Sequence, residues 1–101
     1  MAEGIVHVVA KFVAKPGQEA ALKTALTGLV APTQKDPGYI AYTPYESIQS
    51  PGTFVLVETW ASKDLLASHL ATPHLTGFQA KASELMAAPM EVKLFSELPG
   101  F

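Results

Sequence analysis

The residues best suited to chemistry lie in the second half of the chain, at Glu58, Trp60, His69 and His74. Glu58 stands between Leu56 and Trp60 in an alternating run, so a strand there would place its carboxylate on an apolar face. A buried carboxylate is costly unless it is paired, and burial raises its pKa towards neutrality, where it can serve as a general base. The alternative is a solvated carboxylate near the strand end, or one bonded to a backbone amide.

Two histidines flank a helix break in the segment His69-Leu70-Ala71-Thr72-Pro73-His74. A histidine near its intrinsic pKa accepts a proton readily, so the two are candidates to flank one cavity mouth, with His69 as a base. Their spacing is not that of a helical zinc site and no HExxH motif occurs, so we expect no metal site. The structural alternatives are a half-buried His69 with satisfied hydrogen bonds on the inner edge of its helix, and a His74 that faces solvent in the first turn of the next helix.

Aromatic side chains supply candidate ligand contacts. Trp60 is suited either to the core or to the wall of a pocket for a planar ligand. Strand alternation predicts Tyr39 and Tyr45 on one face and Tyr42 on the other. A tyrosine hydroxyl there can orient a ligand oxygen, although aromatic residues also occur in strands for packing alone.

Composition excludes several classes of protein. The 101 residues carry a net charge of −2 with no basic cluster, so nucleic-acid binding is not expected. No apolar run is long enough for a membrane span, and no secretory signal is recognisable. The chain has no cysteine, which suits a cytoplasmic location. No flavin, nicotinamide or phosphate-loop fingerprint is present, so we expect no bound organic cofactor.

The pattern of the chain predicts the order β-α-β-β-α-β. Strands are expected at residues 5–14, 39–47, 53–60 and 90–98. A helix is expected at 18–30, closed by Pro32; Ser62 is expected to cap a short helix, and Thr72 a further one that Pro89 ends. This order predicts a single α+β, ferredoxin-like domain over residues 1–101, with a four-stranded antiparallel sheet covered by helices on one face.

Both faces of the expected sheet are substantially apolar. Val8 and Phe12 share one face of the first strand, while Val9 and Val13 share the other. The helices of one chain can cover only one of these faces. We therefore predict a homodimer that packs sheet against sheet, the alternative being a second face that is merely exposed.

The motifs together resemble the antibiotic biosynthesis monooxygenase family, including its small quinol monooxygenase-like members. The resemblance rests on residues 12–17, 36–39 and 54–60, and on residues 69–74 with Phe78. It implies a dimeric α/β barrel with a pocket between sheet and helices in each subunit. Phe12, Leu56, Glu58 and Trp60 would line that pocket from the sheet, and His69 and His74 from the helices. We add Phe78 and Tyr39 to the predicted substrate contacts.

The resemblance predicts a cofactor-independent monooxygenase or quinol oxidase whose substrates are O₂ and a small hydroxylated aromatic or quinol-like compound. His69 or Glu58 would remove a phenolic proton, and the anion would give an electron to O₂ directly. The first alternative is an isomerase or tautomerase of a small carbonyl compound that uses the same base without oxygen. The second is a dimer that binds a small molecule without catalysis.

Overall fold

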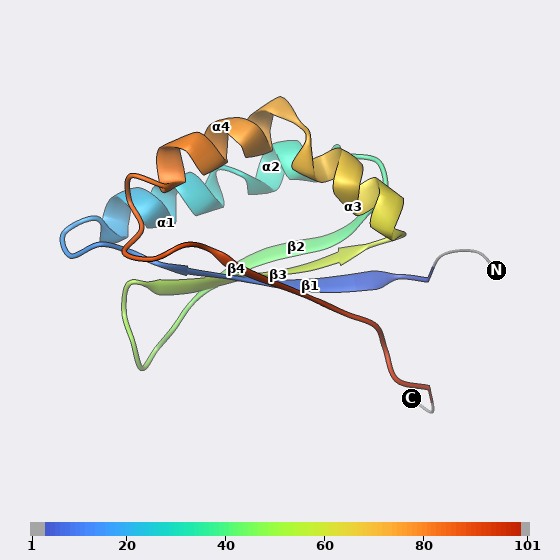
Figure 1. Cartoon of the computed structure of the whole chain (residues 1–101), viewed down its shortest axis with the longest axis horizontal. Helices are drawn as coiled ribbons and strands as arrows, with labels where there is room; N and C mark the ends of the chain where they lie inside the picture. Colours follow the sequence, from blue (N-terminus) through green and yellow to red (C-terminus); the bar gives the residue numbers. More distant parts are fainter. Residues whose placement is uncertain (1–3, 100–101) are drawn as a thin grey trace.

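One antiparallel sheet and a single layer of helices make up residues 4–99, the part of the chain that the computed structural model describes. The elements follow in the order β1 (Val6–Val13), α1 (Glu19–Thr27), α2 (Val30–Thr33), β2 (Tyr39–Glu46), β3 (Thr53–Trp60), α3 (Lys63–Leu70), α4 (Pro73–Ala82) and β4 (Glu91–Phe95). The sheet order is β2-β3-β1-β4. Figure 1 shows all the helices on one face of the sheet and none on the other. The predicted ferredoxin-like α+β fold is therefore confirmed.

The alternation predicted for the two central strands is confirmed. In β1 and β3 every even-numbered residue is buried beneath the helices, and β1 pairs with β3 from Val6 opposite Trp60 to Val13 opposite Thr53. The leucines of α1 pack onto this face, and Leu22 and Leu26 are almost fully buried. Period-2 strands and a period-3.6 helix thus bury their apolar faces against each other, which is what fixes the layers.

The caps predicted for the two later helices are also confirmed. The Ser62 side chain accepts a hydrogen bond from the backbone N–H of Leu65, and Thr72 accepts one from that of Leu75. Each cap satisfies a donor that has no partner inside its helix. Pro73 at the first helical position needs no such partner, so α3 stops and α4 starts at a defined point between His69 and His74.

Three predicted boundaries are wrong. The first helix ends at Thr27, and Pro32 lies inside the short helix α2, where its missing N–H costs nothing because a first turn has no intrahelical acceptor. The last helix ends at Ala82, because the segment after it pairs with the end of β1. The backbone N–H of Lys15 donates to the carbonyl of Leu85, and that of Ala87 donates to the carbonyl of Val13. The last strand is only Glu91–Phe95.

A bulge in β2 changes the predicted faces of the tyrosines. Tyr39 pairs with Trp60 and Ala41 pairs with Thr59, so Ile40 is an extra residue and its side chain is exposed. Tyr39 consequently lies on the helix side together with Tyr42. The prediction that Tyr39 shares a face with Tyr45 is wrong, because one inserted residue reverses the alternation.

The uncovered face of the sheet carries valines on both central strands. Val57 is 39% exposed and pairs with Val9 on β1, and Val55 is half-buried beside it. The edge strand β4 is exposed along its whole length, and Phe95 lies half exposed opposite His7. Among the helices of residues 4–99, none has the length and apolar character that crossing a bilayer requires.

Candidate functional site

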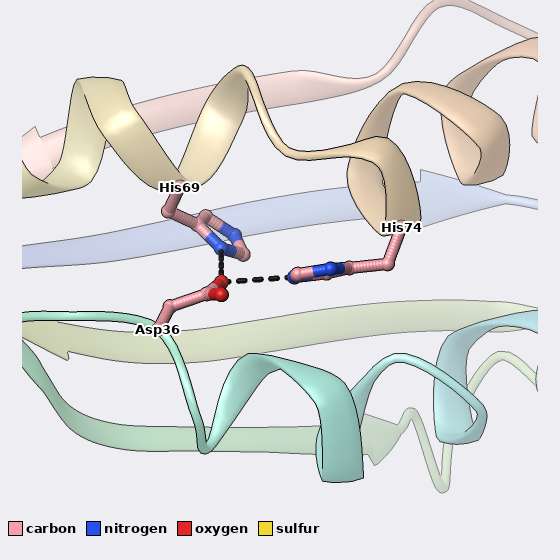
Figure 2. Close-up of side chains that lie close together, drawn as sticks. All are labelled: Asp36, His69 and His74. Atoms are coloured by element: carbon pink, nitrogen blue, oxygen red, sulfur yellow. Dashed lines mark hydrogen bonds and ion pairs between the residues drawn. The ribbon is translucent and has the colours of Figure 1, made fainter.

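Three polar side chains from distant parts of the chain meet beneath the helices. The Asp36 carboxylate oxygen Oδ2 lies 2.8 Å from Nδ1 of His69 and 2.9 Å from Nε2 of His74. Figure 2 shows Asp36 rising from the turn before β2, with His69 at the end of α3 and His74 at the start of α4. The His69 side chain is 1% exposed, that of Asp36 10% and that of His74 23%. The cluster is therefore buried on one side and reaches solvent at His74.

Local structure explains why these groups meet. Gly38 has φ +83°, and a Cβ at this position would stand 2.6 Å from the side chain of Leu65 on α3. Only glycine both adopts this conformation without strain and allows the contact, so the turn that carries Asp36 lies directly against α3. On the other side, the hydroxyl of Thr72 donates to the carbonyl of His69 at 2.7 Å, which fixes the break between the two histidines.

The imidazole of His69 is held between aromatic rings. Its centroid lies 4.4 Å from that of Trp60 at an interplanar angle of 31°, and the Tyr42 ring meets it edge-on at 5.5 Å. Trp60 is itself fully buried and packs edge-on against Tyr39. These contacts leave the imidazole little rotational freedom, so its nitrogens have fixed directions.

Glu58 is the second buried ionisable group of the site. Its Oε1 accepts a hydrogen bond from the indole Nε1–H of Trp60 at 2.9 Å, and the residue is 6% exposed. Burial raises the pKa of Glu58 from 4.5 to about 7, although the Trp60 hydrogen bond opposes the change. Burial, and after it the Glu58 charge, also raises the pKa of the Tyr42 hydroxyl. Near neutral pH the Glu58 carboxyl is therefore divided between its acid and its base form.

The pKa of the Asp36 carboxyl is shifted in the opposite direction from that of Glu58. Burial tends to raise the pKa of Asp36, but hydrogen bonds from His69 and His74 outweigh it, so the pKa lies below its ordinary value. Burial lowers the pKa of His69, and Asp36 offsets this only in part. Asp36 is thus a carboxylate and His69 a neutral imidazole at pH 7. A carboxylate only accepts hydrogen bonds, so the neutral His69 carries its proton on Nδ1 and a lone pair on Nε2.

A cavity of about 120 Å³ lies between the sheet and the helices α3 and α4. Its walls are mostly apolar, and its polar residues are Glu58, His69 and Gln79. The complete lining is Val8, Ala10, Phe12, Glu58, Leu66, His69, Leu70, Leu75, Gln79, Met90, Val92 and Leu94. An engineered apolar cavity of about 150 Å³ binds benzene, so this space suits a ligand of about one ring. Val92 and Leu94 are about half exposed, which leaves the cavity accessible along β4.

The structure brings three of the predicted site residues to this cavity, namely Phe12, Glu58 and His69. Trp60 lies behind Glu58 and His69 and contacts both. The other predicted contacts lie elsewhere: Leu56 is in the core, Tyr39 packs on Trp60, Phe78 packs edge-on against Phe12, and His74 faces an open groove with Phe78. A ligand role for these four residues stays a prediction that the cavity geometry does not favour.

Two residues of the site were not predicted. Asp36 is separated from His69 by 33 positions and was given no role in the site, although residues 36–39 contribute to the family resemblance. Gln79 is exposed on α4 and lines the cavity. The one available signal for Asp36 was indirect: a histidine predicted to be half-buried on a helix edge requires a hydrogen-bond partner, but the sequence does not indicate which carboxylate supplies it.

Comparison with known proteins identifies the class to which this fold and site belong. Residues 5–81 match the model of the family described as antibiotic biosynthesis monooxygenase, and the chain belongs to this family. It is 32% identical over 93 residues to the Mycobacterium tuberculosis protein named "Putative monooxygenase Rv0793", a match that covers 92% of this chain and 91% of that protein.

Two further matches support the assignment. The solved structure of Rv0793 superposes with a TM-score of 0.90 at 31% identity, covering 96% of this chain and 98% of the other. A Bacillus subtilis protein named "Putative monooxygenase YcnE" is 31% identical over 78 residues, which are 77% of this chain and 82% of that protein. The predicted family and fold are therefore confirmed.

Proposed function

We propose that the protein is a cofactor-independent monooxygenase that acts on a small hydroxylated aromatic compound of about one ring. One observation carries the proposal: a neutral, oriented imidazole and a buried carboxyl both line an apolar cavity of about 120 Å³. His69 is the base, and its Nε2 receives the phenolic proton. Asp36 is a positioning residue that holds Nδ1–H and stabilises the imidazolium once it has formed.

The reaction follows from the formation of the phenolate. The anion transfers one electron to O₂, and the resulting ring radical and superoxide combine at an unsubstituted ring carbon to form a peroxide. The proton on His69 returns to the peroxide oxygen. Loss of water, with cleavage of the O–O and C–H bonds, leaves a quinone, so one phenol and one O₂ give one quinone and one H₂O. The protein contributes the base, the orientation and a largely apolar environment.

Glu58 serves this reaction in its neutral form. With a pKa of about 7, a substantial part of the carboxyl is protonated near neutral pH and can donate a hydrogen bond to a substrate oxygen. A carboxylate charge on Glu58 would repel the phenolate in the cavity, so protonated Glu58 is the form suited to bind it. The Trp60 indole keeps Oε1 of Glu58 in place.

The same pair favours one other reaction. A neutral imidazole beside a carboxyl that exchanges its proton near neutral pH can also move a proton between two carbon positions next to a carbonyl. That isomerase or tautomerase would need no oxygen. The two proposals therefore differ in one measurable respect, which is the dependence of turnover on O₂.

The test is oxygen uptake by chelator-treated protein against a panel of phenols, hydroquinones and dihydroxynaphthalenes, with autoxidation subtracted. We expect uptake that falls at least about a hundredfold in His69→Gln, the loss expected for a general base. Glu84→Gln, which changes an exposed carboxylate on the chain after α4, is the matched control for Glu58→Gln. Turnover that continues without O₂ would support the tautomerase instead. Equal uptake by wild type and His69→Gln would refute the role of His69.

We also propose that the uncovered sheet face packs against the same face of a second copy. Val9, Val55 and Val57 form an apolar surface there that the helices of this chain cannot reach. Light scattering at micromolar concentration should give the mass of a dimer or larger assembly. A monomer under these conditions would contradict the proposal.

A further inference from the structure

The side chains of Asp36, His69 and His74 are of the types that bind metal ions. We propose that these three residues form a binding site for a divalent first-row metal ion of the zinc type, in which the metal replaces the two N–H protons now bonded to the Asp36 carboxylate. Imidazole nitrogens and a carboxylate oxygen are ordinary zinc ligands, and three of them leave a position for water. Sequence spacing did not suggest this site, because Asp36 lies 33 and 38 positions from the histidines.

The distances suit a metal with little rearrangement. The three ligand atoms lie within 4.8 Å of one another, and the two nitrogens stand 2.8 and 2.9 Å from the same oxygen. Metal–ligand bonds of about 2.0–2.1 Å place neighbouring ligand atoms about 3.0–3.4 Å apart, depending on geometry. The oxygen must move by a few tenths of an ångström, and His74 must rotate so that the two nitrogens, which lie up to 4.8 Å apart, reach the spacing of neighbouring ligands. His74 is the residue best placed to move, because its side chain is the most exposed of the three and lies in the first turn of α4.

The other two ligands are already held in place. Trp60 and Tyr42 fix the ring of His69, and the close contact of Gly38 with Leu65 fixes the turn that carries Asp36. Supporting contacts of this kind orient metal ligands and strengthen binding. The carboxylate supplies a negative charge to the cluster, which favours a cation.

The proposed metal would lie on the far side of His69 from the cavity. His69 lines the cavity, whereas neither Asp36 nor His74 does. A metal there would not touch a substrate but would act through the imidazole ring. Binding at Nδ1 moves the remaining proton of the neutral ring to Nε2, and the lone pair that the cavity needs is lost. Metal binding therefore inhibits base catalysis, a consequence that rests on the proposed function.

Metal binding is tested directly on the full chain after removal of metal with a chelator and dialysis. Zinc chloride is titrated by calorimetry and cobalt chloride by visible absorption. We expect one saturable site per chain and a rise in thermal midpoint. Even outer residues of a metal site change affinity by about 10–100-fold, so His74→Ala should weaken binding at least about tenfold. The matched control is His7→Ala, which removes the histidine of the other His–carboxylate contact, 3.3 Å from Glu97.

Nitrogen-15 NMR of the imidazole rings tests metal binding at His69 independently of catalysis. We expect His69 to carry its proton on Nδ1 without metal and on Nε2 with zinc, and we expect zinc to abolish any oxygen uptake. If no substrate is turned over, binding and the tautomer change still test the metal site. Absence of saturable binding, or equal binding by His74→Ala and His7→Ala, would overturn the inference even if turnover is found.

Discussion

The buried carboxyl of Glu58 allows a prediction about stability and pH. In Glu58→Gln the side chain keeps its shape, and an amide oxygen can still accept the Trp60 N–H bond that is 2.9 Å long in the wild type. What changes is that the side chain can no longer become charged. Because burial raises the pKa of Glu58 to about 7, the wild-type fold must bear a buried negative charge at high pH, and the variant does not.

The sign and size of the effect follow from the two protonation states. The unfolded chain loses the Glu58 proton near pH 4.5 and the folded chain near pH 7, so between these values the native state binds more protons and its stability falls as pH rises. The pKa difference, at about 1.4 kcal/mol per pH unit, corresponds to about 3 kcal/mol. The free energy of unfolding of Glu58→Gln, measured relative to that of the wild type, should therefore be about 3 kcal/mol higher at pH 8 than at pH 4.5.

Urea unfolding at several pH values and a fixed protein concentration measures this difference. The other ionisable groups are the same in both proteins, so their contributions cancel in the comparison. Glu84→Gln, at an exposed position, should show no comparable pH dependence relative to wild type. If the difference between Glu58→Gln and wild type is the same at pH 4.5 and pH 8, the carboxyl is ionised without cost, and its assignment as a neutral donor is wrong.

Three further predictions concern stability and assembly. Trp60→Phe should lower the free energy of unfolding by about 2–4 kcal/mol, because it removes a buried hydrogen bond to Glu58 and leaves space in the core; urea unfolding measures it. Gly38→Ala should cost at least about 1–3 kcal/mol, since it combines φ +83° with a clash against Leu65; a thermal midpoint equal to wild type would contradict this. Val57→Lys should yield monomers by light scattering, whereas an unchanged mass would exclude the uncovered face as the interface.

Much of the fold was predictable because the signals for it are local. The alternation of β1 and β3, the caps at Ser62 and Thr72 and the order of elements each depend on residues close together in sequence. The bulge at Ile40 was not predictable, because one extra residue in a strand leaves no distinct local pattern. The helix after Thr72 was predicted too long, since its end is set by pairing with the distant strand β1.

The site was predictable in part for the same reason. Glu58 was identified because a polar residue in an apolar pattern is visible in sequence, and His69 because it stands with His74 beside a helix break. The structure brings Glu58 and His69 to the cavity. Asp36 was missed because its role depends on a contact across 33 positions. Tyr39 was assigned to ligand binding from its residue type, but its neighbour in the fold is Trp60.

The residues that line the cavity fall into two groups, which differ in how much a substitution would disturb the core. The two groups proposed to react, Glu58 and His69, are both buried, whereas Val92 and Leu94 line the cavity from β4, an exposed edge strand that within residues 4–99 pairs with β1 alone. Substitutions on β4 can resize the space for a ligand with little effect on the core. A chain built in this way can accept a different ligand through changes on its peripheral strand while the two residues proposed to move protons stay unchanged.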